Sequence, residues 1–314
     1  MNELPAMVIP EVNCFEHIIA RAEKQFAMGK KCRAALLIPA DTDMYLAFKK
    51  AIESGFIEPM IIGDEKAIKN AGGDIERLPG NIPQITTRGF KETISQVAKK
   101  VRAGEIDLII NGRIPVADML GILFKPESDF KVKDRLISHV AVIKPEQYKK
   151  LLLLTDGAVV VNADLKVKLG LIHNIIEVAN RIGIFNPRIA ILAAVEVIYP
   201  QMPVTMEAAI LAKMAERQQI KGAFIDGPLS FDIAVDMFAA HSKGVRNSEV
   251  AGQADALLAP NIEVANGIYK AMALYGHCPM GGIIFGGRVP IALNARSDSQ
   301  ENKFHSIVLG LLTS

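Results

Sequence analysis

The sequence predicts an α/β fold, in which a mainly parallel β-sheet carries helices on both of its faces. Short apolar runs of strand length alternate with amphipathic stretches of helix length along the 314 residues. Runs such as RAALLIPA (33–40) are apolar enough for a strand that is buried on both faces. The alternation is most regular after residue 160, where strand and helix follow one another almost without interruption.

The first half of the chain contains five predicted strands and three predicted helices. The helix at 42–55 begins near Thr42 or Asp43 and has Gly55 just past its end. The strands at 138–143 and 151–156 look like the two arms of a hairpin. The remaining strands are expected at 33–40, 59–64 and 106–112, and the remaining helices at 91–104 and 117–124.

The second half begins with a long predicted helix from Lys166 to Ile182. Right-handed crossovers along the whole chain are expected to place the carboxyl ends of all the strands on one edge of the sheet. The further strands are expected at 188–194, 220–226, 254–260 and 280–286, and the further helices at 206–219, 231–242, 264–276 and 300–312.

Composition and charge exclude several classes of protein. A net charge of +2 and the absence of Trp give no support to a nucleic-acid surface. The three cysteines, Cys14, Cys32 and Cys278, have neither zinc-site nor disulfide spacing. The N-terminal segment lacks the pattern of a signal peptide, and no apolar run reaches the ~18 residues of a membrane span. We therefore expect a soluble cytoplasmic protein without nucleic-acid or membrane partners.

No common nucleotide-binding fingerprint is present, neither G-x-G-x-x-G after a strand nor G-x-x-x-x-G-K-[ST]. Asp232 and Asp236 are four positions apart on the predicted helix 231–242, and paired carboxylates at that spacing can hold Mg²⁺. The simpler interpretation places Asp232 in a first turn, where the helix dipole favours a carboxylate.

Ligands of parallel α/β folds bind beyond the carboxyl ends of strands, so the turns there are the first places to search. The turn Asp226-Gly227-Pro228 follows a predicted strand and is either a tight turn alone or part of a site. The other turns of interest are 111–113, 155–157, 259–261 and 286–288.

One face of the predicted helix 264–276 carries Asn266, Tyr269 and Lys270, spaced i, i+3 and i+4. An amide, a phenol and an ammonium group on one face suit a polar ligand, and they equally suit a face exposed to solvent.

The segment before the last helix combines two arginines with capping signals. Two overlapping capping patterns start at Ser297 and Asp298, so either residue is expected to begin the helix. Arg288 and Arg296 supply positive charge, and a helix N-terminus supplies free N–H groups. The segment is either an anion site or an ordinary capped loop.

With these segments in place, the chain resembles the phosphate acetyl/butyryltransferase family, and within it the phosphate butyryltransferase branch most closely. The resemblance covers nearly the full length and is densest after residue 220. The matching segments are SHVAVI (138–143), KGAFIDGPLSFD (221–232), SEVAGQADALLAPNIE (248–263), YK (269–270) and ARSDS (295–299).

The resemblance implies a reaction in which acyl-CoA and inorganic phosphate give acyl phosphate and free CoA, with CoA as substrate and no tightly bound cofactor or metal. It implies two α/β domains of isocitrate/isopropylmalate dehydrogenase-like architecture, with the active site in the cleft between them, and a homodimer or higher homo-oligomer. We expect a first domain of residues 1–143 plus about 294–314, and a second domain of residues 144–293.

The resemblance also implies roles for individual residues. Arg296 matches the arginine of the family's Ser-Arg pair and is expected to bind the phosphoryl group. The family's carboxylate falls near Glu301 and Asn302, and we assign it to Glu301. The expected substrate-binding residues are Gly112, Arg113, Ser138, His139, Asp226, Gly227, Pro228, Asn266, Tyr269, Lys270, Arg288, Ser297 and Asn302.

The chain departs from the family pattern at Asn111, Ala265 and Ala295, where the family has lysine, glycine and serine. These departures leave three alternatives to a butyryl-type enzyme. They are a phosphate acetyltransferase, a non-catalytic module that binds acyl-CoA, and a metal-dependent dehydrogenase of similar shape that uses Asp232 and Asp236.

Overall fold

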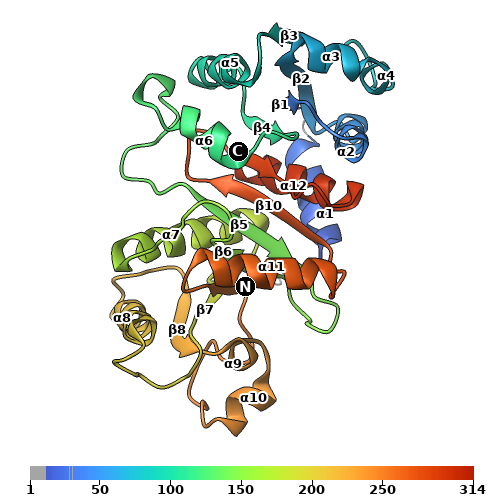
Figure 1. Cartoon of the computed structure of the whole chain (residues 1–314). Coiled ribbons are helices and arrows are strands. Elements are labelled where there is room, and N and C mark those ends of the chain that lie inside the picture. The colour runs from blue at the N-terminus through green and yellow to red at the C-terminus, as the bar shows by residue number, and fades with distance from the viewer. Residues whose placement is uncertain (1–11, 28, 30) are drawn as a thin grey trace, which may run out of the picture.

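The computed structural model describes residues 12–27, 29 and 31–314, and in this part of the chain eleven strands form one sheet. The strand order is β3-β2-β1-β4-β11-β10-β5-β6-β9-β7-β8, and helices cover both faces (Figure 1). The predicted α/β class is confirmed. The sheet is mixed, because β10 runs antiparallel to both of its neighbours and β5 runs antiparallel to β6.

Most of the predicted elements are present within a few residues of the expected positions. The strands are β1 (Cys32–Ile38), β2 (Ile57–Asp64), β3 (Gln84–Thr87), β4 (Leu108–Asn111), β5 (Ser138–Ile143), β6 (Leu152–Thr155), β7 (Arg188–Leu192), β8 (Phe224–Leu229), β9 (Ala256–Leu258), β10 (Met280–Phe285) and β11 (Ile291–Leu293). The helices are α1 (Phe15–Phe26), α2 (Thr42–Glu53), α3 (Glu65–Asn70), α4 (Gly72–Ile75), α5 (Phe90–Arg102), α6 (Val116–Leu123), α7 (Leu165–Ile182), α8 (Pro203–Glu216), α9 (Phe231–Val235), α10 (Met237–Ser242), α11 (Ile262–Leu274) and α12 (Gln300–Thr313), with a 3₁₀ turn, η1 (Pro126–Ser128).

Strand direction corrects one expectation. The predicted hairpin of β5 and β6 is confirmed, with Ala141 opposite Leu154. This hairpin reverses the direction of the parallel strands that follow, so β6, β9, β7 and β8 end at the opposite edge from β1, β2, β4 and β11. The expectation that the strand ends share one edge is therefore wrong.

The structure also corrects one expected helix. The predicted helix 231–242 is two short helices, because Asp236 leaves helical geometry and instead caps α10 through the N–H of Ala239. Helix α2 begins at Thr42, as expected, and Asp41 is its N-cap. The sequence analysis missed the helices α1, α3 and α4 and the strands β3 and β11, and both of these strands are only three or four residues long.

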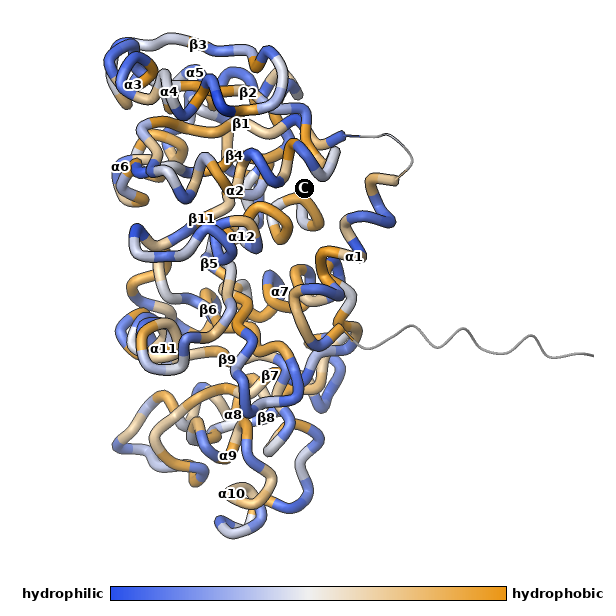
Figure 2. The backbone as a smooth tube through the Cα atoms, turned by 90° about the vertical axis from the view of Figure 1, so that its right-hand side faces the viewer, coloured by the Kyte–Doolittle hydropathy of each residue, from blue (hydrophilic) through white to orange (hydrophobic). Residues whose placement is uncertain are grey.

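The core lies on both faces of the sheet because successive side chains of a strand point to opposite faces. Val140 and Val142 of β5 belong to one hydrophobic cluster, whereas Ala141 and Ile143 belong to another. Helix α12 runs through the middle of the molecule (Figures 1 and 2), and every residue from Lys303 to Thr313 is buried.

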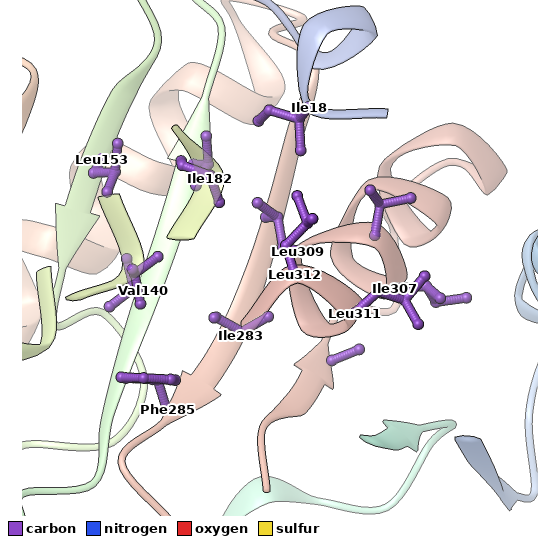
Figure 3. Close-up of a cluster of buried hydrophobic side chains, with 14 of the residues drawn as sticks. Ile18, Val140, Leu153, Ile182, Ile283, Phe285, Ile307, Leu309, Leu311 and Leu312 are labelled. Atoms are coloured by element: carbon purple, nitrogen blue, oxygen red, sulfur yellow. The ribbon is translucent and has the colours of Figure 1, made fainter. Parts of the chain in front are cut away.

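Figure 3 shows side chains that α12 contributes to this core, namely Ile307, Leu309, Leu311 and Leu312, together with Ile283 of β10. Burial of each such side chain stabilises the fold by about 1.5–3 kcal/mol. The C-terminal helix is thus packed firmly against the central sheet. The loop that precedes it is held between this buried helix and the sheet strand β11.

Candidate active site

The loop between β11 and α12 carries Arg296, and its backbone is held by Asp298. One carboxylate oxygen of Asp298, Oδ2, accepts a hydrogen bond from the N–H of Ala295 at 2.7 Å. In return the N–H of Asp298 donates to the carbonyl oxygen of Ala295 at 3.1 Å. Asp298 is only 7% exposed, whereas Arg296 between these contacts is exposed.

The N-terminus of α12 differs from both expected caps. Ser299 is the N-cap residue, and its hydroxyl accepts the N–H of Asn302. The expectation that Ser297 or Asp298 caps the helix is wrong, because the Asp298 side chain turns back to Ala295 instead. Ser297 is exposed beside Arg296. Arg296 lies four positions before Gln300, the first residue of α12.

Helix α11 brings part of its predicted polar face to this loop. The Tyr269 hydroxyl lies beside the Asp298 carboxylate, and Lys270 places its positive charge near the same carboxylate. Burial raises the pKa of the Asp298 carboxyl, and the Ala295 N–H and the charge of Lys270 oppose that rise. Burial likewise raises the pKa of the Tyr269 hydroxyl, so Tyr269 stays protonated at neutral pH.

The start of α11 contacts the loop after β6. The side-chain amide of Asn266 donates to the carbonyl oxygen of Gly157 at 2.9 Å. Asn266 and Lys270 are exposed, whereas Tyr269 is 9% exposed. The alternative that this whole face is exposed to solvent is therefore wrong for Tyr269, whose side chain is buried.

His139 of β5 lies beneath Tyr269, with the two rings edge to face and their centroids 6.2 Å apart. The backbone N–H of His139 donates to the Asp156 carboxylate at 2.7 Å, and this carboxylate also accepts the backbone N–H groups of Ala158 and Val159. Nδ1 of His139 is buried without a hydrogen-bond partner, and burial lowers the pKa of the imidazole. A neutral imidazole is therefore expected here.

Ser138 points to the other face of the sheet. Its hydroxyl accepts a hydrogen bond from Asn174 of α7 at 2.7 Å, and the residue is fully buried. The structure therefore places Ser138 among structural contacts, away from His139 and Tyr269.

The loop after β4 approaches the backbone of the loop after β1 very closely. A Cβ atom on Gly112 would lie 2.2 Å from the carbonyl oxygen of Leu37 and 2.4 Å from that of Pro39. The N–H of Arg113 donates to Pro39 at 2.8 Å, and its side chain is exposed. Glycine is thus required for packing at 112, while Arg113 is free to meet an anion.

Two asparagines at neighbouring strand ends contain unsatisfied polar atoms. Asn111 donates to the carbonyl oxygen of Ile114 at 2.9 Å, but its Oδ1 is buried without a partner. Both polar atoms of the Asn294 side chain, just after β11, are also buried without partners. Sequence reasoning missed Asn294 because the short strand before it, β11, was missed as well.

The remaining candidates near α12 differ in their surroundings. Glu301 is exposed in the first turn of the helix. The Oδ1 of Asn302 accepts the N–H of Met280 at 3.1 Å, so this side chain ties α12 to β10. Lys303, which sequence reasoning also missed, is 1% exposed, and its ammonium group lies 2.8 Å from Asp41.

Two groups of predicted residues lie away from Arg296. Asp226 of β8 binds the N–H of Gly227 and the hydroxyl of Ser248, and a Cβ on Gly227 would clash with Ile191. The turn with Pro228 belongs to the last strand of the sheet, and β10, β5, β6, β9 and β7 separate it from β11.

Arg288 precedes β11, at the end of the strand opposite to Arg296, and forms a salt bridge with Asp129 at 2.5 Å. The two predicted arginines therefore do not meet in one anion site of this chain.

The structure does not support the Mg²⁺ interpretation of Asp232 and Asp236. Asp232 binds Lys243 at 3.0 Å and the hydroxyl of Ser230, while Asp236 caps α10. Among residues 12–27, 29 and 31–314, no group of three or more His, Cys, Asp or Glu side chains is arranged to hold a metal ion. No helix in this part of the chain is long and apolar enough to cross a membrane.

A large, mostly parallel sheet with a basic loop beside a buried tyrosine–aspartate pair defines an α/β protein with an exposed candidate anion site. Comparison with known proteins defines the class further, because residues 75–311 match the phosphate acetyl/butaryl transferase family. The chain belongs to this family and is an acyltransferase of the phosphate acetyl/butyryltransferase type.

The relatives include enzymes named for two different acyl groups. The chain is 35% identical to a phosphate butyryltransferase of Clostridium acetobutylicum over 96% of this chain and 98% of the relative. It is 34% identical to a phosphate acetyltransferase of Thermotoga maritima over 91% of this chain and 96% of the relative.

Among solved structures, a branched-chain phosphotransacylase from Enterococcus faecalis is similar, with a TM-score of 0.76 and 27% identity. The match covers 90% of this chain and 98% of that one. The resemblance stated from the sequence motifs is confirmed at the level of the family.

Proposed function

We propose that this protein transfers a short acyl group, butyryl or one of similar size, between CoA and inorganic phosphate. The observation that carries the proposal is the loop after β11, where exposed Arg296 stands beside the N-terminus of α12. A guanidinium group and free helix N–H groups together suit a phosphate. The similarity to a phosphate butyryltransferase over nearly the whole chain supports the choice of acyl group.

We assign the site to the junction of two domains, residues 1–143 with about 294–314, and residues 144–293. The proximity of Tyr269 to Asp298 supports this assignment, because it brings together a residue of each proposed domain next to Arg296. The exposed side chains of Arg113, Asn266 and Lys270 surround the same loops and are available to acyl-CoA. His139 is proposed to line the site beneath Tyr269.

In the proposed reaction a phosphate oxygen attacks the thioester carbonyl carbon of acyl-CoA. A C–O bond forms, the C–S bond breaks, and the CoA thiolate takes up the proton that the attacking hydrogen phosphate gives up. Arg296 holds the phosphate and offsets negative charge that develops in the transition state. Glu301, exposed in the first turn of α12, is proposed to exchange the proton with the thiol.

Self-association and a cytoplasmic location belong to the same proposal. Large apolar side chains are exposed in the proposed second domain, among them Ile198 at 62%, Leu274 at 65% and Phe238 at 82%. Exposed apolar surface of this kind is typical of protein interfaces and supports a homodimer. Light scattering on the purified protein would give the oligomeric state.

The test is phosphate-dependent release of CoA thiol from acetyl-, propionyl-, butyryl- and branched acyl-CoA, with wild type and Arg296→Ala side by side. We expect turnover in the wild type and a loss of ~10²–10³-fold in the variant, which is typical when one donor to a developing oxyanion is removed. A preference for acetyl-CoA would support the acetyltransferase alternative, which the Thermotoga relative favours. Binding of acyl-CoA without turnover would support the non-catalytic module.

A further inference from the structure

We infer that Asp298 is a positioning residue that sets the shape of the loop carrying Arg296 and links this loop to α11 through Tyr269. The inference rests on the proposed function and deepens it, because it assigns the support of the anion-binding arginine to two named side chains. Neither Asp298 nor the Tyr269 hydroxyl needs to touch the reacting atoms for this role.

The first support is the local geometry of the loop. Asp298 contacts both polar groups of the Ala295 backbone, the N–H through Oδ2 at 2.7 Å and the carbonyl oxygen through its own N–H at 3.1 Å. These two hydrogen bonds close a turn whose two central residues are Arg296 and Ser297. The backbone of Arg296 is therefore fixed from both sides, while its side chain stays exposed.

The second support is the burial of the carboxylate. Asp298 is 7% exposed, and a carboxylate that is removed from water must be compensated by hydrogen bonds and positive charge. Compensation comes from Ala295, from the Tyr269 hydroxyl, and from the positive charges of Lys270 and Lys303. These partners can all meet the buried carboxylate only if the loop has one defined conformation.

The third support is the rigidity of Tyr269 itself. Its ring is 9% exposed and meets the His139 ring edge to face, so the phenol is held by the sheet as well as by α11. Asp298 thus connects the last loop of the chain to β5 and α11. A 1 Å displacement of a group that positions substrate costs ~10²-fold in rate, so this connection matters for Arg296.

The test compares Asp298→Asn and Tyr269→Phe with matched controls of the same chemistry, Asp236→Asn and Tyr275→Phe. Asparagine remains a good N-cap at 236, and Tyr275 is 82% exposed. We expect Asp298→Asn to lower kcat/KM for phosphate by about ten-fold and Tyr269→Phe by about three-fold, as for a mildly displaced arginine. KM for acyl-CoA should stay within about two-fold of wild type, since neither substitution is expected to change the contacts that bind acyl-CoA in its ground state.

A double variant separates a shared role from two independent ones. Tyr269→Phe added to Asp298→Asn should cause no further loss, because both changes break one connection. Calorimetric titration with inorganic phosphate, in the absence of acyl-CoA, should show phosphate affinity weakened more by Asp298→Asn than by Tyr269→Phe. The pH dependence of kcat/KM should keep its wild-type shape at a lower plateau.

Wild-type phosphate kinetics in Asp298→Asn, or additive losses in the double variant, would overturn the positioning role while leaving the proposed function intact. Loss of the acidic limb of the pH profile would overturn it too, since Asp298 would then transfer protons itself. If Asp298→Asn fails to fold, the phosphate kinetics of Tyr269→Phe, which removes only one hydroxyl, still test the positioning role. A wild type without turnover on any acyl-CoA would overturn the proposed function and this role together.

Discussion

Lys303 and Asp41 form an ion pair across 262 positions of the chain, with the ammonium nitrogen 2.8 Å from Oδ1 of the carboxylate. Lys303 belongs to α12 and its side chain is 1% exposed, while Asp41 is the N-cap of α2. The pair therefore joins the helix that follows the Arg296 loop to the first crossover helix of the sheet.

Breaking this pair from its two sides should have unequal effects on stability. Asp41→Ala takes the nearer carboxylate from a buried ammonium, which keeps only Asp43 at 4.0 Å, and it removes the cap from the N–H of Met44, so we expect a loss of about 3–5 kcal/mol. Lys303→Met removes the buried charge together with its desolvation cost and should lose less, about 1–2 kcal/mol. Urea denaturation measures both, and an equal or larger loss in Lys303→Met would contradict this account.

The two arginines that flank β11 should differ in their effect on activity. Arg288 is paired with Asp129 at the end of the strand opposite to Arg296. We expect Arg288→Ala to keep kcat/KM for phosphate within about three-fold of wild type, because a surface ion pair contributes only ~0–1 kcal/mol. Phosphate kinetics of Arg288→Ala beside Arg296→Ala check this, and comparable losses would place both arginines in one site.

Gly112 should not tolerate a side chain. A Cβ atom there would stand 2.2 Å from the carbonyl oxygen of Leu37, so either the loop after β1 or the loop carrying Arg113 must move. We expect Gly112→Ala to lose about 1–3 kcal/mol, by analogy with overpacked cores.

Gly121 of α6 is the matched control for Gly112, since its Cβ would meet nothing within 4 Å. Gly121→Ala should gain about 0.5–1 kcal/mol, because alanine is the better helix former. Thermal denaturation of both variants tests this comparison. Equal stability of Gly112→Ala and wild type would show that the two loops can accommodate a Cβ atom at position 112.

His305 of α12 should make stability fall in mild acid. Its ring stacks on Phe15 with centroids 3.8 Å apart, and burial lowers its pKa to about 4. Above its unfolded pKa of ~6.5 the imidazole is neutral in both states and contributes no pH dependence. Between ~6.5 and about 4 the unfolded chain binds the proton and the folded chain does not, so stability falls as pH falls.

Denaturation of wild type and His305→Gln at pH 7 and pH 5 measures this contribution. The shift corresponds to a loss of about 2 kcal/mol between these pH values, which His305→Gln should lack. The exposed His17 is the control, since His17→Gln should keep the wild-type fall. An identical fall in all three proteins would assign the acid sensitivity to other groups.

Much of the fold was predictable because its signals are local. The apolar run of β1 and the amphipathic pattern and glycine stop of α7 are written in neighbouring residues. The motifs around Asp226, Tyr269 and Arg296 were sufficient to indicate the family, which the comparisons confirm. Short elements such as β11, of three residues, were missed because they form only where neighbouring strands supply hydrogen bonds.

By itself the sequence determined the α/β class, most element positions and the family, because periodicity and motif spacing act over a few residues. Only the tertiary structure decided that Arg288 and Arg296 stand at opposite ends of β11, and that Asp298 turns to Ala295 and Tyr269 rather than capping α12. Strand direction and burial decide these contacts. Both depend on pairings between distant segments, such as β10 with β5, that no local pattern encodes.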